Sequence, residues 1–123
     1  MSQVGKSHLV LIFTVEPEDV AEGDRIFSTH GEWMRGHPSE GPEALLGYTV
    51  SKGPEVSNPL DPNSEPTGRT TFVVDEYFES AAGIARHLQD AADNWAEMSS
   101  ALPQWASRAK TILLHNGSVI HAR

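Results

Sequence analysis

The chain of 123 residues contains no cysteine. Disulfide bonds, cysteine-ligated zinc, iron–sulfur clusters and thiol nucleophiles are therefore excluded. Long hydrophobic runs are missing as well. The first apolar run, over residues 8–15, is shorter than a signal peptide, and no later segment approaches the length of a membrane span. We therefore expect a cytoplasmic protein with no membrane partner.

Positive charge is scarce. Lysine and arginine number 9 against 17 acidic residues, which gives a formal net charge of −8. An acidic chain repels a phosphate backbone, so no nucleic acid is expected as a partner. The remaining composition, 38% hydrophobic and 21% charged, is that of a globular protein. A chain of this length is expected to form a single domain, residues 1–123, with a core that needs no covalent links.

Two signatures of well-known sites are missing too. No G-x-G-x-x-G segment and no G-x-S-x-G elbow occurs in the sequence. The 6 histidines show no H-x-H or H-E-x-x-H spacing. The spacing of the residues therefore predicts no dedicated metal site.

The first half of the chain predicts a strand, a helix and a second strand. Residues 8–15 are rich in β-branched and aromatic side chains, which is typical of a strand. Pro17 suits the first turn of a helix, and its acidic neighbours complement the positive end of the helix dipole. This helix is expected to run to about Arg35. Residues 44–51 predict the second strand.

Residues 53–69 differ from the rest of the chain. They carry several prolines among serines and asparagines, and they show no hydrophobic period. We expect a long loop here, and loops of this length in a compact domain are usually functional or disordered. The loop either covers a pocket, reaches over a partner or is a mobile decoration. Its prolines favour a defined arm, because they lower the entropy cost of ordering.

The second half of the chain predicts two more strands and further helical turns. Residues 69–78 predict the third strand, and Ser80 can cap the helix that follows. A shorter helical piece is expected over residues 97–109. Near the end, Asn116 and Gly117 stand between two apolar runs and predict a two-residue hairpin turn, hence an additional strand.

The resulting order, β-α-β-β-α-(α)-β with an extra strand, favours an α+β fold with a split βαβ sheet of the ferredoxin-like kind. Apolar residues occupy both faces of the first and third strands, yet two helices can cover only one face. The second face requires another sheet. A homodimer that pairs sheet against sheet is the most economical way to supply one.

A short motif adds a family resemblance. In the segment FVVDEYFESAAGIARH, residues 72–87, an E-x-aromatic-x-S pattern is formed by Glu76, Phe78 and Ser80, and a helix with His87 follows. This pattern resembles the antibiotic biosynthesis monooxygenase (ABM) family of dimeric α/β barrels, and the order of elements agrees with that family. The resemblance implies a ferredoxin-like protomer whose sheet pairs into a barrel, with a pocket between sheet and helices. Some members oxygenate phenols, anthrones or quinols without metal or flavin, others degrade haem, and many have no assigned reaction.

The sequence departs from the family at three positions. Members that oxidise anthrones resemble one another in placing Asn and Trp four residues apart on the third strand, where this chain has Val74 and Phe78. The position that we match to the ligand histidine of the haem-degrading branch holds Glu97. The amide, the indole and the haem ligand are therefore missing, and no cofactor is expected.

Three polar residues are candidates for catalysis. His30 lies on the apolar stripe of the first helix, where it is either a general base in an aromatic pocket or a core histidine bonded to a backbone carbonyl. His87 matches the histidine of the family motif, and it is either a base, a substrate-orienting group or a structural hydrogen-bond partner. Glu76 shares a strand face with apolar residues. It is either an acid or base poised by desolvation, or a carboxylate that is exposed or paired with an arginine.

Four aromatic side chains are candidates for substrate binding: Trp33, Tyr48, Phe72 and Phe78. They either stack on a flat aromatic ligand or belong to the core. The expected function is a cofactor-independent monooxygenase that deprotonates a hydroxylated aromatic or polyketide-like small molecule, whose anion then reduces O₂. A non-catalytic barrel that binds a small ligand, and a non-oxidative isomerase or cyclase, are the alternatives. The first hypothesis requires the three candidate catalytic side chains to converge on one cavity.

Overall fold

The computed structural model describes residues 3–123, which form a four-stranded antiparallel sheet and three α-helices. The elements in chain order are β1 (Ser7–Val15), η1 (Pro17–Asp19), α1 (Val20–Met34), β2 (Leu45–Val56), β3 (Pro66–Phe78), α2 (Ala81–Asn94), η2 (Ala96–Ser99), α3 (Ala101–Ser107) and β4 (Lys110–Ser118). Across the sheet the strands are ordered β2-β3-β1-β4. This α+β arrangement is compatible with the predicted ferredoxin-like split βαβ fold. Among the described residues, no helix is long and apolar enough to cross a membrane.

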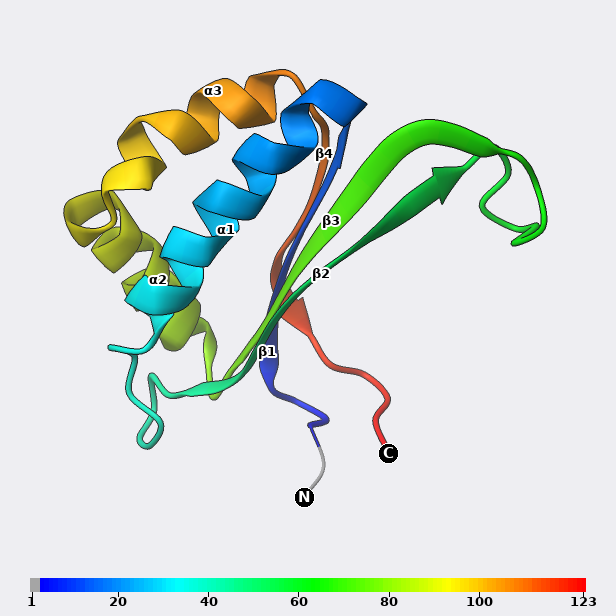
Figure 1. The fold of residues 1–123 in the computed structure, drawn as a ribbon. Helices are drawn as coiled ribbons and strands as arrows, with labels where there is room; N and C mark the ends of the chain where they lie inside the picture. Colours follow the sequence, from blue (N-terminus) through cyan, green and yellow to red (C-terminus); the bar gives the residue numbers. More distant parts are fainter. Residues whose placement is uncertain (1–2) are drawn as a thin grey trace.

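All three α-helices lie on one side of the sheet (Figure 1). Successive side chains of a strand point to opposite faces, so each strand offers alternate residues to the helical layer. Accordingly Leu9, Phe13 and Val15 of β1 are buried beneath the helices. The helices contribute Ile26 of α1 and Ile84 of α2 from their apolar stripes. The core therefore lies between the sheet and the helical layer.

Helix α1 approaches the core most closely at Gly23. A Cβ atom at this position would lie 2.6 Å from Cζ2 of Trp105 and 2.8 Å from Cζ of Phe72. The indole of Trp105 is held in place, because its Nε1–H donates a hydrogen bond of 2.8 Å to the carbonyl oxygen of Asp19. A glycine on α1 therefore sets the distance between this helix and the two rings beneath it.

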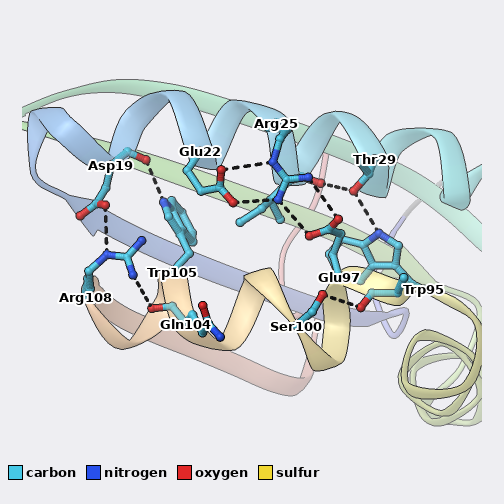
Figure 2. A network of polar contacts seen from close by, with 12 residues as sticks. Asp19, Glu22, Arg25, Thr29, Trp95, Glu97, Ser100, Gln104, Trp105 and Arg108 are labelled. Atoms are coloured by element: carbon cyan, nitrogen blue, oxygen red, sulfur yellow. Dashed lines mark hydrogen bonds and ion pairs between the residues drawn. The ribbon is translucent and has the colours of Figure 1, made fainter.

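A polar network joins α1 to the segment between α2 and β4 (Figure 2). At its centre Arg25 pairs with Glu22 of its own helix at 2.7 Å and with Glu97 of η2 at 3.0 Å. The indole Nε1–H of Trp95 donates to Oγ1 of Thr29 at 3.2 Å. Exposed ion pairs add little to stability. The network nevertheless fixes the position of η2 above the sheet, and Trp95 forms part of the site described below.

The predicted loop over residues 53–69 is wrong at both ends and correct in its middle part. Strand β2 runs to Val56 and β3 begins at Pro66, so the two strands form one long hairpin whose connection is residues 57–65. The prediction failed at the ends of this segment because proline usually interrupts a strand, and the prolines were therefore assigned to a loop. Here Pro54 lies in β2, an edge strand of the sheet. Proline is tolerated in an edge strand, because its missing N–H can be on the side that has no neighbouring strand. In Figure 1 the end of the hairpin projects beyond the helical layer.

The predicted hairpin turn at Asn116 and Gly117 is also wrong. Both residues lie within the single strand β4, which pairs with β1. The register of that pairing shifts between His8 and Val10, and Asn116 has a φ of 52°. A residue in the left-handed region serves a β-bulge as well as a turn, and this one forms a bulge. The extra strand at the end of the chain is therefore not present among the described residues.

The remaining predicted elements are confirmed with shifted ends. The first helix ends at Met34, and the helical piece predicted over residues 97–109 is formed by η2 and α3. Ser80 occupies the N-cap position of α2, but its hydroxyl donates to the carbonyl oxygen of Pro42 at 2.6 Å rather than to the helix.

The sheet face away from the helices is apolar near its centre, as the sequence predicted. In the register of the sheet, Ile12 of β1 lies between Val73 of β3 and Ile112 of β4. On β4 the side chains of Ile112 and Leu114 are 53% and 45% exposed. The protomer therefore carries a second apolar surface outside its core.

Candidate functional site

Three buried polar side chains meet between the sheet and the helices. His30 of α1 is 5% exposed, Glu76 of β3 is 1% exposed and His87 of α2 is 4% exposed. Nε2 of His87 lies 3.0 Å from Oε1 of Glu76, and Nε2 of His30 lies 3.9 Å from its Oε2. We call these three residues the His–Glu–His cluster. They are the three catalytic candidates of the sequence, and the structure brings them together.

Local sequence periodicity explains why the cluster points inward. Glu76 stands two residues after Val74 and two before Phe78, so all three side chains face the helical layer. His30 follows Ile26 by four residues and therefore shares its buried helix face. On α2, His87 precedes Ala91 by four residues, so the two side chains share one helix face, and both are buried.

Two outer residues orient the imidazole rings. The hydroxyl of Tyr48 lies 2.8 Å from Nδ1 of His30. Nδ1 of His87 lies 2.8 Å from Nε2 of His37, whose own Nδ1 lies 3.1 Å from the carbonyl oxygen of Met34. A carbonyl only accepts, so a neutral His37 donates from Nδ1 and accepts at Nε2. His87 then donates from Nδ1, which leaves the lone pair of its Nε2 directed into the cluster.

The burial of the cluster decides its charge state. Loss of water, with a smaller effect of the Asp75 carboxylate, raises the pKa of Glu76 to about 8. Burial, together with neighbouring histidines, lowers the pKa of His30 to about 3. Burial and the adjacent His37 lower the pKa of His87 to about 4. At neutral pH the metal-free cluster is therefore a carboxylic acid between two neutral imidazoles rather than an ion pair.

One atom of the cluster lacks a hydrogen-bond partner. Oε1 of Glu76 is buried and, among the described residues, has no aligned donor or acceptor. Nε2 of His87 lies 3.0 Å away, but in the tautomer described above it carries a lone pair and donates no hydrogen bond to this oxygen. The two facing atoms therefore require either the proton of the neutral carboxyl or a cation between them.

A small cavity adjoins the cluster. It has a volume of about 90 Å³, and apolar side chains of β1, α1, α2, η2 and α3 form most of its wall. The ring of Trp95 lies 4.7 Å from that of His30 and closes one side. Met98 and Leu102 of the helical layer also line this cavity.

The four predicted aromatic residues lie in different places. Tyr48 contacts the cluster through its hydroxyl, as described above. Trp33 lines an open cleft of about 640 Å³ between the end of α1 and helix α2, here called the outer cleft, and its ring lies 4.7 Å from that of His37. Phe72 and Phe78 are packed in the hydrophobic core. Both Phe78 and Trp33 nevertheless approach the cluster, each with its ring 5.4 Å from that of His87.

The sequence analysis missed His37. This residue follows the end of α1 and precedes Pro38, so no periodic pattern marks it. It lines the outer cleft and contacts the cluster through His87, a residue 50 positions away in the chain. His8 of β1 pairs instead with Asp75 on the opposite face of the sheet. Only the three-dimensional contact distinguishes His37 from the other scattered histidines.

The cluster also has the composition of a metal site. One ligand atom from each of its three residues lies within 4.8 Å of the other two. Spacing along the chain did not indicate such a site, because the three residues come from three separate elements. Comparisons with protein-family models, with curated proteins and with solved structures found no match.

Proposed function

We propose that this protein is a cytoplasmic, cofactor-independent monooxygenase of the ABM type that acts on a small hydroxylated aromatic compound. The observation that carries the proposal is the convergence of His30, Glu76 and His87 on one cavity with apolar walls. A non-catalytic barrel has no need for three buried polar side chains at a ligand cavity, where each costs free energy.

The proposed reaction begins with proton transfer. The lone pair of His87 Nε2, which lies beside Glu76 in the wall of the cavity, accepts the hydroxyl proton of the substrate. Tyr48 and His37 hold the two rings in place. The resulting anion is electron-rich and reduces O₂ directly. One oxygen atom enters the ring as a carbonyl, and the other leaves as water with two hydrogens of the substrate. The substrate supplies all the electrons, so the balance requires no separate reductant.

The size of the cavity restricts the substrate. A cavity of about 150 Å³ accepts benzene, whereas the present one measures about 90 Å³. A single ring therefore fits only if part of the wall moves. Met98 is the side chain of this wall best suited to move, because methionine has several rotatable bonds. We therefore propose substrates of one aromatic ring, such as quinols, ahead of anthrones.

The proposal includes a homodimer that pairs the open sheet faces into a barrel. The apolar surface around Ile12, Val73 and Ile112 supports this assembly, since a contiguous apolar patch of this kind usually marks an interaction site. Sedimentation equilibrium at micromolar concentration is expected to give twice the mass of the chain. A monomer at all concentrations would contradict this part of the proposal and leave the chemistry of the cluster untouched.

Oxygen uptake tests the proposed reaction. Chelator-treated protein is mixed with a quinol or an anthrone in an oxygen electrode, and product is identified by mass spectrometry. We expect uptake that falls by about 100-fold or more in His87→Ala, the usual range for loss of a general base. His8→Ala is the matched control, because it removes a histidine with a carboxylate partner on the opposite sheet face.

Each other outcome has a definite meaning. Ligand binding without uptake would favour the non-catalytic barrel or an isomerase, and the proposed reaction would be wrong. Uptake that is equal in wild type and in His87→Ala would show that the cluster is not the base. Circular dichroism of each variant checks that loss of uptake does not reflect loss of the fold.

A further inference from the structure

We infer that the His–Glu–His cluster is also a binding site for one divalent ion of the first transition series. Two imidazoles and one carboxylate are the donor set of many catalytic zinc sites and of the two-histidine, one-carboxylate iron sites. The inference is independent of the oxygenase proposal, because it concerns what the three side chains can hold rather than the reaction they perform.

The separations of the ligand atoms suit a single ion. Donors about 2.1 Å from one metal ion lie about 3.0 to 3.5 Å apart from each other. Nε2 of His87 lies 3.0 Å from Oε1 of Glu76, and Nε2 of His30 lies 3.9 Å from Oε2 of the same carboxyl group. One ligand atom from each of the three residues lies within 4.8 Å of the other two. Bringing the widest pair to coordination distance requires a side-chain shift of about 1 Å.

The outer contacts are those that a metal site needs. A histidine ligand almost always gives its second ring nitrogen to a hydrogen-bond partner, which fixes the tautomer and the ring orientation. Here Nδ1 of His30 is hydrogen-bonded to the hydroxyl of Tyr48. Nδ1 of His87 is hydrogen-bonded to His37, which is itself bonded to the carbonyl oxygen of Met34. In both rings the nitrogen left over for coordination is Nε2, the atom that points at Glu76.

A second observation points independently to a missing ligand partner. Oε1 of Glu76 is fully buried without an aligned hydrogen-bond partner among the described residues. When Glu76 is ionised, a bound cation takes the place of the proton between Oε1 and Nε2 of His87 and neutralises the carboxylate at the same time. The adjoining cavity of about 90 Å³ leaves room for water or substrate as further ligands. Three protein ligands with open positions are the pattern of catalytic metal sites rather than closed structural ones.

The donor set also selects the class of ion. Imidazole favours zinc, iron, cobalt and copper, whereas magnesium and calcium prefer oxygen donors alone. The proposed ligand is therefore Zn²⁺ or Fe²⁺, and not an alkaline-earth ion. Metal and substrate proton compete for the same lone pairs on His30 and His87. A metal-loaded cluster consequently cannot act as the histidine base of the proposed reaction.

Cobalt titration tests the inference without any activity measurement. Co²⁺ is added to chelator-treated full-length protein, and visible absorption bands of four- or five-coordinate cobalt report binding. We expect saturation at one ion per chain, displacement by Zn²⁺ and no competition from a large excess of Mg²⁺. Affinity is expected to fall by more than about 100-fold in Glu76→Gln and in His87→Ala, and by about 10-fold in Tyr48→Phe, which alters only an outer contact.

Matched controls separate this site from adventitious binding by surface histidines. His8→Ala and His115→Ala remove histidines outside the cluster and are expected to leave the titration unchanged. X-ray absorption of the zinc-loaded wild-type protein provides a test that does not depend on whether a substituted protein folds. It is expected to show two imidazole ligands and oxygen donors at about 2.0 to 2.1 Å.

The outcomes are distinct from those of the oxygen-uptake experiment. Failure of the wild type to bind cobalt, equal affinity in Glu76→Gln, or loss of binding in His8→Ala would each overturn the metal site. None of these results bears on uptake by chelated protein. Conversely, uptake that requires added metal would refute the cofactor-independent reaction while leaving the metal site in place.

Discussion

The same substitution at two positions of α1 provides a sharp test of the packing described above. Gly23→Ala and Gly31→Ala each add one methyl group to the same helix. At Gly23 the new Cβ would lie 2.6 Å from a carbon of Trp105 and 2.8 Å from one of Phe72. At Gly31 the nearest atom is the hydroxyl oxygen of Tyr48, at 4.0 Å, an ordinary contact distance.

The two changes are expected to have opposite signs. In a helix interior, alanine is more stable than glycine by about 1 kcal/mol, and Gly31→Ala should gain most of this amount. Gly23→Ala gains the same term but forces an overpacked core, which typically costs about 1 to 3 kcal/mol or more. The rings of Trp105 and Phe72 are 0% and 1% exposed, and the indole is tied to Asp19, so neither can move aside cheaply.

Urea denaturation followed by circular dichroism measures both effects. We expect Gly31→Ala to unfold at a higher urea midpoint than wild type, and Gly23→Ala at a clearly lower one, with unchanged slopes. A Gly23→Ala protein as stable as wild type would refute the close packing of α1 on the two rings. Cobalt binding by Gly31→Ala is expected to equal that of wild type, which checks that the cluster is undisturbed.

Three further predictions concern stability. Folded metal-free Glu76 keeps its proton up to a pKa of about 8, against an ordinary value of 4.5, so the free energy of unfolding should fall by about 2 kcal/mol as the pH rises from 6.5 to 8.5. Urea titrations of Glu76→Gln in the same buffers should lack this fall, and an equal fall there would contradict the raised pKa. Asn116→Val should destabilise by about 1 to 2 kcal/mol in thermal melts, whereas Asn116→Gly should not, because only the β-branched residue resists a positive φ. Trp105→Phe leaves the carbonyl oxygen of Asp19 without its hydrogen-bond donor and should lower the free energy of unfolding, measured from the urea midpoint, by about 2 kcal/mol. A variant as stable as wild type would show that this hydrogen bond of 2.8 Å does not contribute to stability.

The layered architecture could be predicted from sequence because it depends on hydrophobic period. The alternation of β1 and β3 and the stripes of α1 and α2 each indicate one buried face, and both sets were correct. The two errors came from signals with more than one physical meaning. Pro54 marks a loop or an edge strand, and the positive φ of Asn116 suits a turn or a bulge. The local sequence does not distinguish a loop from an edge strand, or a turn from a bulge, since the pairing of the strands in the sheet decides between these alternatives.

The candidate site was predictable in its centre and not in its surroundings. His30, Glu76 and His87 were recognisable because each is a polar residue on an otherwise apolar face. Their mutual distances depend on how α1, β3 and α2 pack, and no spacing along the chain encodes that. His37 lies beyond the end of a helix, where no period applies. Tyr48 was expected either to stack on a ligand or to belong to the core, and neither alternative included the hydrogen bond to His30.

The irregular edges of the sheet have a consequence for the solubility of the folded chain. A sheet with two free edges offers unpaired backbone groups that can recruit strands from other molecules. Here β2, at one edge, contains Pro54, and β4, at the other, is bent by the bulge at Asn116. Each interruption removes a stretch of regular backbone at which edge-to-edge growth could begin. Edge-to-edge association is therefore disfavoured at both edges of the sheet.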